Sequence, residues 1–311
     1  MRRRLFLQSG LTATALGLPR ASLAALRRPV DDARSRGRDL AGMMGITTGS
    51  FTRHLGPAAR SRFALLDLPK IMRDELDLQV IDLMTATFPY RDAAYCERFR
   101  KAADDAGRIV TNLKLNLDVD PTSDDAEVRR TAIGAYRQGI DAAQRLGCRW
   151  VRPAAGPKRP NVERLAAAYR ELIEYAEPRG ISLLVENNGW MRSDPSALPR
   201  LVEAVGPGVA VQPDTGNWTP EARYAGLERA YPSAVSCDFK ALKLGPDGSH
   251  ADYDLRKCFD IGRRAGFRGP WCFEHFHDDL AQLLREFVLL RDLLRTWTAE
   301  YDQSAAGKPG G

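Results

Sequence analysis

Short apolar runs alternate with amphipathic segments along most of the chain, and this alternation constrains the fold more than any other feature. The runs, rich in valine, isoleucine and leucine, lie at residues 43–48, 78–84, 109–117, 148–153, 181–187, 209–214, 234–240 and 270–275. Amphipathic segments such as 123–146, 161–177 and 278–297 lie between or after them. Strands alternating with helices indicate a parallel sheet, and eight such units predict a single-domain (β/α)8 TIM barrel.

The first residues of the chain predict an export signal. Residues 3–8, Arg-Arg-Leu-Phe-Leu-Gln, resemble a twin-arginine motif, and a short apolar run and small residues follow. We therefore predict a signal peptide over 1–24, transport by the twin-arginine export machinery, and a periplasmic or extracellular location after cleavage. The alternative is a basic amphipathic start to the domain. A charged linker over 25–40, the barrel over 41–298 and a flexible tail over 299–311 complete the predicted organisation.

Charge and cysteine usage narrow the classes of partner. The formal net charge is +6, but residues 1–24 contribute only arginines to it, and elsewhere lysine and arginine are scattered among acids. This pattern is typical of a solvated surface and argues against nucleic acid as a partner. The five cysteines are odd in number and widely spaced, so we expect buried free thiols and no disulfide framework.

Acidic residues end four successive predicted strands. Glu186, Asp214, Asp238 and Glu274 lie at the carboxyl ends of the last four apolar runs, where a TIM barrel builds its active site. Four converging carboxylates repel one another strongly unless a counter-ion lies between them, and oxygen ligands suit a divalent cation. We therefore predict a metal site. The alternative is that each acid caps the following helix or pairs with an arginine.

Polar and aromatic residues near the same strand ends form a candidate substrate site. Basic side chains there could offset the acids, and tryptophan rings commonly stack on sugars, although ordinary packing at the rim is the alternative. The predicted substrate-binding residues are Lys114, Arg152, Asn188, Trp190, Asn217, Trp218, Lys240 and His275.

Several of these motifs together resemble a known family. The stretches LLVENNGW, VQPDTGNW, DFK and CFEHF resemble the xylose isomerase-like superfamily, in its sugar phosphate isomerase/epimerase-like branch, over residues 41–298. The resemblance implies that Glu186, Asp214 and Glu274 are metal ligands. It also implies that the two glutamates exchange protons with the substrate carbon, one from each face.

The chain departs from the family pattern at three positions. The strand 7 ligand is usually a histidine two residues before a lysine, and here Asp238 precedes Lys240. Asp238 could bind a hard cation, which favours Mn²⁺ or Mg²⁺ with Co²⁺ or Zn²⁺ as other possibilities, or it could pair with Lys240 and leave the metal weak or absent. Asn217 and Arg192 replace a histidine and a glutamate of the ketohexose epimerases, which argues against a free ketohexose as substrate.

The sequence thus predicts a divalent-metal-dependent isomerase or epimerase that acts on a keto-sugar or sugar derivative through an enediolate. One alternative is a lyase that eliminates from a 3-keto-glycoside at the same site, and another is a non-catalytic sugar-binding barrel. A phosphodiesterase or abasic-site endonuclease is disfavoured, because such enzymes need many histidines and this chain has four. The sequence leaves open which sugar is bound and how many subunits assemble.

Overall fold

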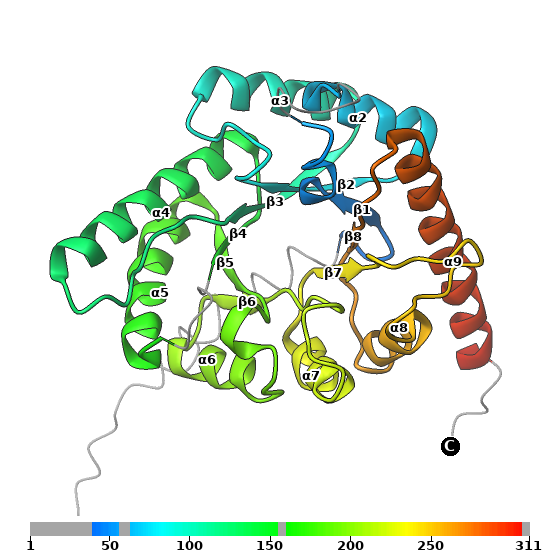
Figure 1. Ribbon diagram of the computed structural model, residues 1–311. Helices are drawn as coiled ribbons and strands as arrows, with labels where there is room; N and C mark the ends of the chain where they lie inside the picture. The colour runs from blue at the N-terminus through cyan, green and yellow to red at the C-terminus, as the bar shows by residue number, and fades with distance from the viewer. Residues whose placement is uncertain (1–38, 56–62, 155–159, 307–311) are drawn as a thin grey trace, which may run out of the picture.

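The computed structural model describes residues 39–55, 63–154 and 160–306, which form a TIM barrel (Figure 1). The predicted fold class is therefore confirmed. The predicted signal peptide, and all but the last two residues of the predicted linker, lie outside the described residues.

Eight parallel strands form the barrel wall, each within or overlapping an apolar run of the sequence. Their order in the sheet is β6-β5-β4-β3-β2-β1-β8-β7, and isolated parallel bridges from Val211 to Ala234 and from Asp214 to Asp238 join its two edges. The strands are β1 (Met44–Thr47), β2 (Val80–Met84), β3 (Ile109–Leu115), β4 (Trp150–Pro153), β5 (Ser182–Val185), β6 (Val209–Val211), β7 (Cys237–Lys240) and β8 (Trp271–Glu274).

Helices surround the strands on the outside of the barrel (Figure 1). They are α2 (Leu68–Ile71), α3 (Ala93–Asp105), α4 (Ala126–Leu146), α5 (Val162–Ala176), α6 (Ala197–Val205), α7 (Arg223–Ala230), α8 (Leu255–Arg264) and α9 (Leu280–Ala306). Local capping fixes several of their starts: the side chain of Asn161, for example, accepts a hydrogen bond from the Arg164 amide at the start of α5. None of the described helices is long and apolar enough to cross a membrane.

Both faces of the strands are buried, which explains their continuous apolar runs. Side chains facing outward pack under the helices, whereas an apolar plug fills the end of the barrel where the strands begin. This plug consists of Leu40, Trp150, Leu184, Ala210 and Val235. Leu40 lies within the predicted linker, yet it is fully buried. The ordered domain therefore begins before residue 41, because an apolar side chain from this segment closes the barrel floor.

Two further sequence predictions concern the tail and the thiols. Helix α9 continues through Ala306, into the segment where we predict a flexible tail. Glu300 pairs with Arg256 and Asp302 pairs with Arg263, so ion pairs to α8 hold this extension in place. All five cysteines are buried and free, as the sequence predicts.

Candidate active site

A layer of buried polar residues lies above the apolar plug. Asp82 accepts hydrogen bonds from the Thr111 hydroxyl at 2.5 Å and from Gln212 Nε2 at 2.7 Å. Gln212 in turn accepts one from Asn112 Nδ2 at 3.0 Å. This layer supplies hydrogen bonds to a buried carboxylate, and it forms a polar base on which the next layer rests.

Acidic side chains from neighbouring strands meet at the carboxyl end of the barrel. One carboxylate oxygen from each of Glu186, Asp214 and Asp238 lies within 4.8 Å of the others, and all three residues are buried. The direct bridge between Asp214 and Asp238 brings the ends of β6 and β7 together. Glu274 lies beside Lys240 in the register of β7 and β8 and joins the group through that lysine. The predicted convergence of acids therefore occurs, with three in one cluster and the fourth at its edge.

Asp238 forms an ion pair with Lys114 and not with Lys240. Lys114 Nζ lies 2.5 Å from Asp238 Oδ1 and 2.6 Å from Oδ2, and both side chains are only 1% exposed. The same ammonium donates to Thr47 Oγ1 at 3.2 Å. Although burial alone disfavours the ammonium, Asp238 raises the pKa of Lys114. Both oxygens of Asp238 are thus engaged by a cation that the barrel wall itself provides.

Lys240 lies between the remaining acids. Its Nζ is 2.8 Å from Asp214 Oδ2, 3.2 Å from Glu274 Oε1 and 2.8 Å from the side-chain oxygen of Asn217. Asn217 also donates from Nδ2 to Glu186 Oε1 at 2.8 Å, so its amide links the lysine to Glu186. Lys240 therefore joins Asp214 and Glu274 directly, and it is linked to Glu186 through Asn217.

Glu186 pairs with the neighbouring strand end through Arg152, whose Nε lies 3.0 Å from Glu186 Oε2. Glu186 Oε2 and Asp214 Oδ2 both lie at ion-pair distance from a cation, yet neither accepts a well-directed hydrogen bond from any described residue. Two buried carboxylate oxygens thus retain unused acceptor capacity, which suits a ligand or an ion.

Burial and neighbouring charges shift the pKa values of these groups. Burial raises the pKa of Asp214 to about 6, with Lys240 opposing the shift. Burial acts against the charge of Lys240, yet Asp214 outweighs it and the pKa of this lysine is raised. Burial likewise disfavours the Glu186 carboxylate, but Arg152 and Lys114 outweigh it and lower its pKa. Near neutral pH, Glu186 is therefore an ionised base beside ionised cations.

The residues after β5 and β6 shape the loops around the acids. Asn187 donates from Nδ2 to the Asp214 carbonyl at 3.0 Å and accepts from the Asp214 amide at 2.7 Å, fixing the two strand ends together. Asp214 Oδ1 accepts from the amides of Gly216 and Asn217. A Cβ on Gly216 would lie 2.6 Å from Lys240 Cδ, so glycine here leaves room for the lysine stem.

Three residues of the predicted substrate site, Trp218, His275 and Trp190, pack in or against the protein core. Trp218 is 1% exposed and packs against Gly226 of α7, which is the placement of a core residue. The two ring nitrogens of His275 lie 2.5 Å from the Ala241 carbonyl oxygen and 2.6 Å from Glu286 Oε2, so the ring is held within the barrel wall. Trp190 is partly buried against the core.

Two loop residues of the site have structural contacts. The side chain of Asn188 accepts from the Gly189 amide at 2.6 Å and begins a short 3-10 helix. Arg192 donates from Nε to the Asn217 carbonyl at 2.8 Å and so connects the loops after β5 and β6. The sequence analysis did not predict the buried polar residues Asp82, Asn112 and Gln212. Each is a polar residue within an apolar run, and that interruption could have identified it as part of a buried polar layer.

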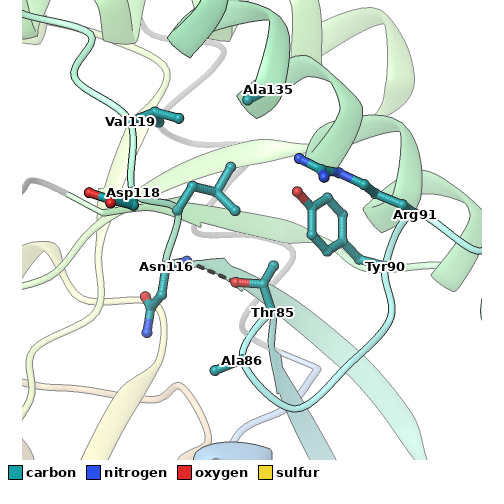
Figure 2. A pocket seen from close by; sticks show the side chains of 9 residues that line it. Thr85, Ala86, Tyr90, Arg91, Asn116, Asp118, Val119 and Ala135 are labelled. Carbon is teal, nitrogen blue, oxygen red and sulfur yellow. Dashed lines mark hydrogen bonds between the residues drawn. The ribbon is translucent and has the colours of Figure 1, made fainter.

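A recess of about 350 Å³ opens at the same end of the barrel, beyond β2 and β3 (Figure 2). Thr85, Tyr90, Arg91, Asn116 and Asp118 contribute polar groups to its lining. The buried hydroxyl of Tyr90 has no hydrogen-bond partner among the described residues. Thr85 and Asn116 follow the carboxyl ends of β2 and β3, whereas none of the four clustered acids lines the recess.

Comparison with known proteins places the chain in a family. The sequence profile described as xylose isomerase-like TIM barrel matches residues 74–297, and the chain belongs to this family. No curated protein sequence matches the chain significantly.

Solved structures with the same fold include sugar epimerases. D-psicose 3-epimerase from Clostridium cellulolyticum H10, solved with D-tagatose, is 15% identical with a TM-score of 0.67, covering 82% of this chain and 98% of that chain. L-ribulose 3-epimerase is 18% identical with a TM-score of 0.64, covering 86% and 99%. A xylose isomerase-like TIM barrel protein from Mycobacterium smegmatis in complex with magnesium is 19% identical with a TM-score of 0.60, covering 83% and 97%. At these identities the likeness is one of fold.

Proposed function

We propose that the protein is a divalent-metal-dependent sugar isomerase or epimerase that acts on a keto-sugar or sugar derivative through an enediolate. The observation that carries the proposal is the gathering of buried carboxylates from four strand ends at one mouth of a xylose isomerase-like barrel. Proton transfer beside a carbonyl needs positioned bases and nearby positive charge, and this site contains both.

The residues fit a hard divalent cation. Carboxylate oxygens of Glu186, Asp214 and Asp238 lie within 4.8 Å of one another, and Glu186 Oε2 and Asp214 Oδ2 accept no well-directed hydrogen bond from described residues. Because Lys114 engages both oxygens of Asp238, the acids left for an ion are Glu186, Asp214 and Glu274, the last of which joins the cluster through Lys240. We propose that Glu186, Asp214 and Glu274 would hold Mn²⁺ or Mg²⁺, for which oxygen ligands are preferred. An ion bound there would supply positive charge to the substrate oxygens as the sugar enolises.

The protein side chains account for the proton transfers. We propose that the Glu186 carboxylate removes the proton from the carbon next to the carbonyl, leaving the electron pair in the enediolate. Glu274, at the end of β8, then donates its own carboxyl proton to the other face of that carbon, which gives the epimer and leaves Glu186 protonated and Glu274 ionised. Donation to the adjacent carbon gives the isomer instead. Proton exchange with solvent restores both groups. Arg152 lies against Glu186 and keeps it ionised for the first step.

The recess lined by Tyr90, Asn116 and Asp118 offers polar groups for the rest of a sugar derivative. Export, which we propose from residues 1–24, would present unphosphorylated sugars to the site.

We expect NMR analysis of ketoses and 3-keto-glycosides incubated with the purified protein and Mn²⁺ to show an epimer or isomer of at least one sugar. Chelation with EDTA should lower this rate at least about tenfold, since stabilisation of the enediolate charge is lost, and added Mn²⁺ should restore it. A product lacking a substituent would indicate elimination. Binding of a sugar without turnover would identify a non-catalytic sugar-binding barrel and contradict the proposal.

A further inference from the structure

Lys240 Nζ lies between Asp214 and Glu274, two of the three acids that we propose as metal ligands. Its ammonium contacts Asp214 and Glu274 directly at 2.8 and 3.2 Å, and it contacts the Asn217 oxygen at 2.8 Å. These oxygens come from the ends of β6 and β8 and from the loop after β6. The ammonium occupies carboxylate oxygens that a divalent ion would need as ligands, and its single positive charge offsets part of their negative charge.

The surrounding chain is built to keep the lysine there. The stem of Lys240 runs alongside Gly216, where any larger residue would lie against its Cδ and Cγ. The lysine side chain is 12% exposed, and its backbone amide donates to Thr215 Oγ1 at 2.9 Å. The ammonium is therefore a packed part of the site and not a mobile surface charge.

Asp238 cannot take over as a free ligand, because Lys114 engages both of its oxygens. In addition, Gln212 Nε2 in the polar layer below donates a hydrogen bond to Asp238 Oδ1 at 3.4 Å. The carboxylates left for an ion are those of Glu186, Asp214 and Glu274, and Lys240 contacts the last two.

We infer that Lys240 acts as an internal competitor for the metal: a divalent ion binds only when it displaces this ammonium from Asp214 and Glu274. The inference rests on the metal site of the proposed function and defines how that site is regulated. It follows that the wild-type protein binds divalent ions weakly, and that removal of the lysine charge creates a stronger site.

Titration with Mn²⁺, followed by calorimetry and by the loss of free Mn²⁺ EPR signal, tests this inference. Lys240→Met keeps the stem but removes the charge, and we expect it to bind one Mn²⁺ at least about tenfold more tightly than the wild type, the change expected when one charge-assisted contact no longer has to be broken. Lys240→Gln, which retains a hydrogen-bond donor, should change in the same direction and serves if the methionine variant does not fold.

The control is Lys101→Met, which removes an exposed lysine paired with Asp105 at 2.8 Å on α3 and should leave Mn²⁺ affinity unchanged. Equal affinities of wild type and folded Lys240 variants would overturn the inference, as would stoichiometric Mn²⁺ that survives dialysis of the wild type. Absence of Mn²⁺ binding in folded variants would overturn it too. Turnover of a sugar by the wild type is measured separately, so the proposed function can stand if this inference fails.

Discussion

Replacement of either glutamate at the strand ends by glutamine is expected to lower the rate of epimerisation or isomerisation by about 10²–10⁴-fold, the usual contribution of a positioned general acid or base. Glutamine keeps the shape of the side chain, and in Glu186→Gln its oxygen can still accept from Asn217. The loss should therefore reflect proton transfer and not collapse of the site. The rate is measured by NMR on the sugar that the wild type converts, with Mn²⁺ at saturation for each variant.

The matched control is Glu171→Gln, which alters a half-exposed glutamate of α5 that pairs with Arg137 at 2.8 Å. This variant should retain the wild-type rate. Circular dichroism and thermal melting of Glu186→Gln and Glu274→Gln show whether the fold is kept. If both folded variants convert the sugar as fast as the control does, the assignment of proton transfer to these residues is wrong.

Replacement of Lys114 by methionine is expected to destabilise the protein by about 3–5 kcal/mol, because it leaves the buried Asp238 carboxylate without its cation. Both partners are 1% exposed, so water cannot replace the lost contact without opening the barrel mouth. Urea unfolding gives the free energy of unfolding for the wild type and the variant.

Two companion variants separate the ion pair from the packing of the lysine stem. Lys101→Met breaks an exposed ion pair, which is expected to contribute at most about 1 kcal/mol. The double variant Lys114→Met with Asp238→Leu removes both charges and should recover most of the stability lost in Lys114→Met. A loss in Lys114→Met no larger than that in Lys101→Met would show that the buried pair contributes little.

The fold could be predicted because its signal is local and periodic. Each apolar run coincides with a strand that is buried on both faces, and strands of a parallel barrel all place their carboxyl ends at one mouth. The same rule predicted that Glu186, Asp214 and Asp238 would meet, because Glu186 and Asp214 follow strands and Asp238 lies two residues before the end of β7. Position along a strand therefore carried enough information to locate the site.

The ion pairs inside the site could not be predicted from strand positions. Which lysine pairs with Asp238 depends on how far each side chain reaches across the barrel. Lys114 lies on β3, which is separated from β7 by β2, β1 and β8 in the sheet. The position of Trp218 depends on Gly226 of α7 leaving room for the ring, and no periodicity in the sequence indicates this contact. Strand ends identify which groups gather, whereas packing decides which of them touch.

The most direct test of the proposed chemistry is the conversion of the sugar in D₂O with Mn²⁺, followed by mass spectrometry and by NMR of the carbons beside the carbonyl. Removal of a proton to Glu186 and delivery of another from Glu274 predicts one solvent deuterium in the product, at the carbon that enolises. A product free of deuterium, or full incorporation by a variant carrying both Glu186→Gln and Glu274→Gln, would contradict the account.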